Sequence, residues 1–124
     1  MSDIVDFIEM RLREDEQIAR AASGGHLPGA DRWQVDGMQV WTELDCPPGR
    51  TLVVKHTWPH EADHIARHDP ESVLREIESK RQALKAYADN STREPDYWDA
   101  IDWWLRSIAT VYSDHPDFQP EWAA

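Results

Sequence analysis

The chain contains one cysteine, few basic residues relative to its acidic ones, and no long apolar run. Cys46 is the single cysteine among 124 residues, which excludes an internal disulfide and a zinc site built from several cysteines. Lys and Arg number 13 against 24 Asp and Glu, and the net charge of −11 argues against binding to nucleic-acid backbones. No segment resembles a signal peptide or approaches a membrane span. We therefore expect a cytoplasmic protein that contacts neither nucleic acid nor membrane.

The chain does contain enough apolar and aromatic residues for a core. At 124 residues, folding buries roughly two-thirds of the surface of the unfolded chain. Seven tryptophans contribute to that burial. We therefore expect a single domain over residues 1–124 that needs no cofactor to fold.

Apolar spacing predicts a first helix over residues 3–22. Its apolar stripe consists of Ile4, Ile8, Leu12, Ala19 and Ala22. Asp15 falls inside that stripe, where a carboxylate needs either an open edge or a basic partner.

A three-stranded antiparallel meander is predicted over residues 32–58. Apolar segments on both sides of Asp36 and Gly37 are typical of a β-hairpin, and a second turn follows at residues 45–49. The next segment, "TLVVKHTW", is rich in β-branched residues. Strict alternation places Leu52, Val54, His56 and Trp58 on one face of it.

Three further helices are predicted over residues 59–68, 70–88 and 96–112, followed by a tail over residues 113–124. Asp69 suits the N-cap of the second of these helices and Pro70 its first position. Arg81 interrupts that helix's apolar stripe, so we expect either an Asp15–Arg81 ion pair or two side chains that reach nearby edges. The fold class is α+β: an N-terminal helix, a small three-strand meander, three helices and an extended C-terminal tail.

Four histidines, at positions 56, 60, 64 and 68, recur every fourth residue. On a helix, His60 and His68 would be separated by about 12 Å along the axis, which is too far to share one tetrahedral ion. His68 would suit the C-terminus of its helix, where the dipole favours a cation. We expect a helix surface and a cap; the alternative is a zinc site that uses His56, His60 and His64.

The last predicted helix carries a tryptophan on an acidic face. Trp103 points away from the expected core, on the same side as Asp96 and Asp99, with Asp102 beside it. Such a residue is covered either by the chain's own tail, through Phe118 and Trp122, or by a partner. We expect the tail to cover it.

No nucleophile elbow, phosphate loop, dinucleotide fingerprint or zinc-protease motif is present, so no catalytic residue is predicted. Three stretches, "FIEMRLREDEQIARAA", "HIARHDPESVLREIESKRQALKAY" and "VYSDHPDFQPEW", together resemble a family of small uncharacterised proteins from actinobacteria such as Streptomyces and from their phages. The family's function is unknown, so the resemblance implies no reaction.

The resemblance does imply a set of motif residues. These are Asp15, Glu16, Arg20, His64, Arg67, His68, Asp69, Pro70, Arg75, Glu76, Lys80, Arg81, Asp114, His115, Pro116 and Trp122. Relatives often carry cysteines where this chain has residues 90–93, a departure that disfavours a metal site here. From the predicted elements, five residues could converge in one polar seam that fixes the packing or holds a ligand: Asp15, His64, His68, Arg81 and His115.

Three functions are compatible with these patterns. The preferred one is a non-enzymatic accessory protein that binds a protein partner, or a second copy of itself, through the Trp103 surface. The second is a metal- or small-ligand-binding domain that uses the histidine cluster. The third is an acidic mimic of DNA that inhibits a nucleic-acid-binding protein.

Overall fold

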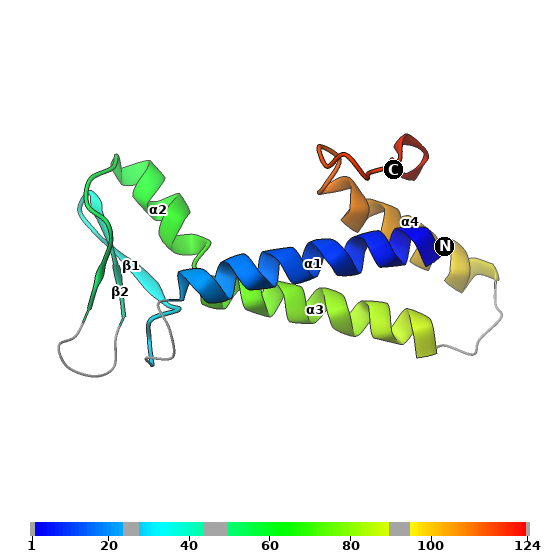
Figure 1. Ribbon diagram of the computed structural model, residues 1–124, viewed down its shortest axis with the longest axis horizontal. Helices are drawn as coiled ribbons and strands as arrows, with labels where there is room; N and C mark the ends of the chain where they lie inside the picture. Colours follow the sequence, from blue (N-terminus) through cyan, green and yellow to red (C-terminus); the bar gives the residue numbers. More distant parts are fainter. Residues whose placement is uncertain (1, 24–27, 44–49, 90–94, 124) are drawn as a thin grey trace. The chain divides into compact units, whose positions relative to one another are not determined.

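The computed structural model describes residues 2–23, 28–43, 50–89 and 95–123 (Figure 1). Its helices are α1 (Ser2–Ala22), α2 (Pro59–Arg67), α3 (Pro70–Asp89), α4 (Pro95–Thr110) and the short 3-10 helix η1 (Pro120–Trp122). Its strands are β1 (Trp33–Asp36), β2 (Gln39–Thr42) and β3 (Leu52–Val54). The predicted α+β class and order of elements are confirmed. None of the helices in the described ranges is long and apolar enough to cross a membrane.

The chain divides into two compact units. Unit 1 comprises residues 1–14 and 79–124, and unit 2 comprises residues 15–78. Because α1 and α3 each pass from one unit into the other, each unit contains part of both helices. The single domain predicted from the sequence stays a prediction.

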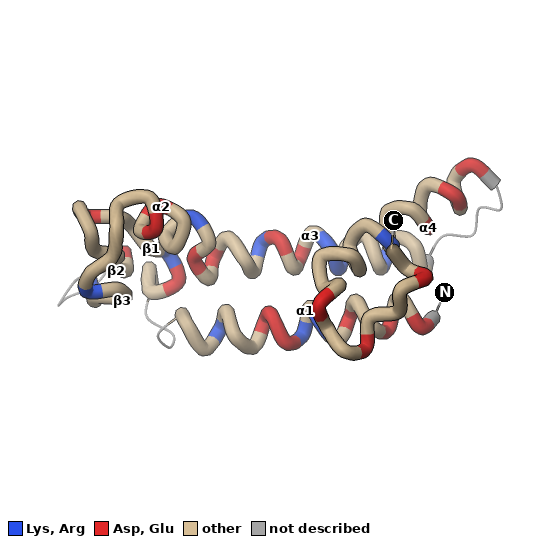
Figure 2. Tube along the Cα trace, turned by 90° about the horizontal axis from the view of Figure 1, so that it is seen from above, with Lys and Arg blue, Asp and Glu red and all other residues tan. Residues whose placement is uncertain are grey.

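Unit 1 is a helical unit whose core comes from α1, α3, α4 and the tail. Its largest fully buried side chains are Ile8, Leu12 and Leu105. The N-terminal half of α1 and the C-terminal half of α3 run antiparallel, with α4 and the tail in the same unit (Figures 1 and 2). The 3-10 helix contacts α4.

Unit 2 contains the sheet, in the order β1-β2-β3, with α2 in contact with β1 and β2. Val40 and Ala62 are fully buried, and burial alternates along β2, as expected for a strand with one covered face. The hairpin turn lies one residue later than predicted, because Asp36 pairs with Gln39 and the loop is Gly37-Met38. Gly37 has a φ of 64°, which suits glycine at the first loop position of a type II′ turn.

The prediction that Leu52, Val54, His56 and Trp58 share one face of the third strand was wrong. β3 ends at Val54, so His56 and Trp58 lie outside it, and both are exposed. A register shift between Val40 and Trp41 pairs Leu52 with Trp41 and Val54 with Val40. Strict alternation fails here because an irregularity in the pairing changes which face the following residue takes. The second predicted turn, at residues 45–49, lies outside the described residues.

Asp69 connects the sheet to α3 within unit 2. Its carboxylate accepts the Ser72 backbone N–H at 2.9 Å, the hydrogen bond of an N-cap, as the sequence predicts. The other carboxylate oxygen accepts the Trp33 backbone N–H at 3.0 Å. Asp69 is only 8% exposed, so one buried carboxylate accepts hydrogen bonds from backbone N–H groups of both the first turn of α3 and the first residue of β1.

Candidate functional site

The α4 helix exposes an acidic surface with a tryptophan in it. Trp103 is 64% exposed, and Asp96 and Asp99 are exposed as well. With Asp102, these residues span an arc of about 120° on the helix, because each residue advances about 100°. We call Asp96, Asp99, Asp102 and Trp103 the acidic α4 surface; Figure 2 shows the acidic positions along this helix.

Arg106 borders this surface and connects α4 to the tail. Its Nε donates to Asp102 Oδ2 at 2.9 Å, and its Nη1 donates to the Glu121 carbonyl oxygen at 2.7 Å. The ion pair offsets the charge of Asp102, so Asp96 and Asp99 supply the negative charge of the surface.

The expectation that the tail covers Trp103 was wrong. The tail packs instead on Phe7 of α1, whose ring centroid lies 5.2 Å from that of Trp122 and 6.2 Å from that of Phe118. Trp122 is buried by this arrangement. The tail takes this position because the Phe7 ring offers a buried aromatic partner, and the Trp103 indole is left exposed.

A buried arginine, Arg11, lies beside Phe7, and the sequence analysis did not predict it. Arg11 is 4% exposed, and its guanidinium carbon lies 5.2 Å from the centroid of the Phe7 ring. Arg11 Nη2 donates to Glu14 at 3.0 Å, and Nη1 contacts Nε2 of His115. The signal that could have identified Arg11 is its position one turn after Phe7 and directly before Leu12.

His115 lies between two hydrogen-bond donors. The Asp117 backbone N–H donates to its Nδ1 at 3.0 Å, while Arg11 reaches its Nε2. A neutral imidazole accepts at one ring nitrogen and carries a proton on the other, so His115 accepts from one of these two donors at a time, and the guanidinium offers no acceptor in return. The Phe7 ring packs edge-on against the imidazole, with a centroid distance of 5.6 Å.

Substitutions at His115 should therefore show whether a side chain that can accept a hydrogen bond from Arg11 is tolerated better than one that can only donate. We expect His115→Gln to change the free energy of unfolding by less than about 1 kcal/mol, because its amide oxygen can accept from Arg11. His115→Lys should cost about 2–3 kcal/mol, because a second cation then faces a buried guanidinium. Urea unfolding measures both, and equal losses in the two variants would contradict this role for His115.

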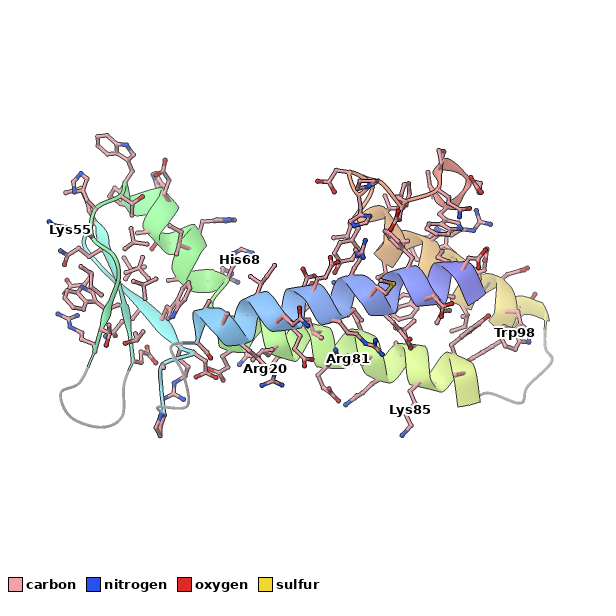
Figure 3. The ribbon with its side chains drawn as sticks, in the orientation of Figure 1. Arg20, Lys55, His68, Arg81, Lys85 and Trp98 are labelled. Atoms are coloured by element: carbon pink, nitrogen blue, oxygen red, sulfur yellow. The ribbon has the colours of Figure 1, made fainter. Side chains whose placement is uncertain are left out.

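The four clustered histidines lie on and beside α2 in unit 2. His68 is the C-cap residue of α2, and its Nδ1 lies 2.8 Å from the His64 carbonyl oxygen. The ring centroids of His64 and His68 are 4.4 Å apart, and Figure 3 shows His68 between the end of α2 and the start of α3. All four side chains are exposed. Within the described ranges, no group of three His, Cys, Asp or Glu residues could hold a metal ion. Zinc binding by His56, His60 and His64 stays a prediction.

The predicted polar seam falls in both units. Asp15, His64 and His68 belong to unit 2, whereas Arg81 and His115 belong to unit 1. Asp15 and Arg81 are half-buried, and each takes part in an interaction of the chain. Within the seam, His64 lies beside His68. His115 contacts Arg11, which was not among the predicted seam residues. The Asp15–Arg81 pair stays a prediction.

Comparison with known proteins gives a family. The model of a family of unknown function, DUF6221, matches residues 1–124, so the chain belongs to that family. No curated protein and no solved structure matches the chain. The membership confirms the resemblance to an uncharacterised family, whereas an actinobacterial or phage origin stays a prediction.

Proposed function

We propose that this member of the DUF6221 family is a non-enzymatic accessory protein of a bacterium or phage that binds a protein partner through the acidic α4 surface. The observation that carries the proposal is the exposure of Trp103 on a helix whose neighbouring tail packs elsewhere. A large exposed indole costs free energy in water, and such residues are frequent among those that dominate binding energy at interfaces.

The chemistry of the surface indicates the partner. Asp96 and Asp99 lie on the same face of α4, within two turns before Trp103, and the whole chain carries a net charge of −11. We expect a partner with an apolar pocket for the Trp103 ring and a rim of Lys or Arg around it. Complementary charge would accelerate association and disfavour neutral or acidic competitors.

Self-association is the second form of the same proposal. Two copies that meet through this surface would bring Asp96 and Asp99 of both chains close together, so salt would strengthen the contact by screening their repulsion. Salt would weaken binding to a basic partner. Sedimentation of the purified protein at low and high salt distinguishes the two forms.

The test is a comparison of matched tryptophan variants. Trp58 in unit 2 is 69% exposed, a fraction similar to the 64% of Trp103, and its two neighbours in the sequence, Thr57 and Pro59, are uncharged. We expect Trp103→Ala, and separately the double variant Asp96→Asn, Asp99→Asn, to lose the same protein in quantitative affinity purification from the source cells. Trp58→Ala should retain it.

The expected reduction in affinity is at least about thirtyfold for Trp103→Ala, because truncating a tryptophan at the centre of an interface costs about 2 kcal/mol or more. The proposal fails if Trp58→Ala and Trp103→Ala lose the same proteins, or if Trp103→Ala loses none. Circular dichroism of each variant verifies that the fold is retained.

A further inference from the structure

A groove of about 450 Å³ lies within unit 1, between the N-terminal half of α1 and the C-terminal half of α3. Its apolar lining comes from Val5 on α1 and from Leu84 and Ala88 on α3. Volumes of 300–1,000 Å³ are typical of small-molecule sites, so the groove is large enough for a small organic ligand.

The charged lining of the groove has the opposite sign to the protein as a whole. Among the described residues, three cations line it (Arg13, Arg81 and Lys85) together with one carboxylate, Glu9. Figure 3 shows Arg81 and Lys85 one turn apart on α3. Arg81 already takes part in an interaction within the chain, so the exposed Arg13 and Lys85 are the cations that give an anionic group favourable electrostatic energy here.

The groove is also polarised along its length. Because the two helix segments run antiparallel, Val5 lies at the same end as Ala88, and Arg13 at the same end as Arg81 (Figure 1). One end is therefore apolar and the other cationic. Residues 5 and 13 are separated by about 12 Å along the helix axis.

From this arrangement we infer that the groove binds an anionic amphiphile, a molecule with an acidic head and an unbranched apolar chain about as long as the groove. The head would lie beside Arg13, whose guanidinium suits carboxylate or phosphate oxygens, at the end of the groove that Arg81 also lines. The apolar chain would cover Val5 and Leu84. Lys85 has a flexible stem that allows its amine to reach the head from α3.

The test uses decanoate as the probe, kept below the concentration at which it forms micelles. We expect a Kd on the order of 1 mM or tighter, the range for a ligand of this size. Backbone NMR shifts should move at residues that line the groove. Acetate supplies the head alone and decylamine reverses its charge, so neither should bind there. Decyl phosphate in place of decanoate shows which acidic head is preferred.

Variants that remove one charge from the groove test whether cations in the lining strengthen the binding of decanoate. Arg13 and Lys85 are exposed, so Arg13→Gln and Lys85→Gln should leave the fold intact. Each should weaken decanoate binding about three- to fivefold, whereas Glu9→Gln should tighten it, because it removes the one anion in the lining. Arg20→Gln removes an exposed cation of α1 that does not line the groove, and it should change nothing.

The inference is overturned if decanoate moves no groove resonance at 2 mM, or if decylamine binds as well as decanoate. It is also overturned if Arg20→Gln weakens binding as much as Arg13→Gln does, since the effect would then come from net charge alone.

Discussion

Phe7→Ala is expected to lower the free energy of unfolding by about 3–5 kcal/mol, the cost of truncating a buried phenylalanine. Phe7 is 6% exposed, and its ring contacts four aromatic side chains: Tyr112, His115, Phe118 and Trp122. Its removal leaves a cavity beneath the tail and deprives Arg11 of the ring beside its guanidinium. Urea unfolding followed by circular dichroism measures the loss.

Met10 supplies the matched control on the same helix. It is 54% exposed, and Met10→Ala should change the free energy of unfolding by less than about 0.5 kcal/mol. The Phe7 variant should also increase proteolytic cleavage in the tail, which then lacks its main aromatic contact. A loss below 1 kcal/mol in Phe7→Ala would show that the tail does not depend on this ring.

Asp69→Ala should cost about 2–4 kcal/mol through a different mechanism. The substitution removes the N-cap of α3, which contributes about 1 kcal/mol. It also leaves the Trp33 backbone N–H without its acceptor in a part-buried position, at a further 1–3 kcal/mol. The effect is large because one carboxylate serves two elements of unit 2.

Asp69→Asn separates the two contributions. Asparagine caps helices as well as aspartate does, but its amide offers one oxygen where the carboxylate offers two. We therefore expect a loss intermediate between the wild type and Asp69→Ala. Asp63→Ala removes an exposed carboxylate from α2 and serves as the control. Equal stability of Asp69→Ala and Asp63→Ala would contradict the bridging role of Asp69.

The helical elements were predictable from local signals. The apolar spacing of α1 and the Asp69-Pro70 pair before α3 are signals between residues close in the sequence. The helices that they predict therefore do not depend on how distant parts of the chain pack. The hairpin was also predictable, because Gly37 permits the positive φ that its turn requires, although the loop begins one residue later than predicted.

The features that the sequence analysis missed depend on long-range pairing. A shift in register beside Val40 decides which face Leu52 takes, and no local pattern encodes that shift. Likewise, Phe118 and Trp122 could pack on any exposed ring within reach of the tail. Only the folded arrangement of unit 1 selects Phe7 rather than Trp103.

Part of the candidate site was visible in the sequence. Trp103 and its acidic neighbours were recognised from helical spacing alone, because an amphipathic helix shows its outer face directly. Arg11 was missed, because a single arginine beside an apolar stripe is usually a surface residue. Arg11 is buried because the tail, about a hundred residues further along the chain, packs over Phe7 and brings His115 to the guanidinium.

The most direct test of the acidic α4 surface is site-specific photo-crosslinking in the source cells, with the photoreactive residue at position 103 or at position 58. We expect one discrete adduct from position 103, which the double variant Asp96→Asn, Asp99→Asn reduces, and no matching adduct from position 58. Identical adducts from both positions, or none from position 103, would contradict a binding role for the acidic α4 surface.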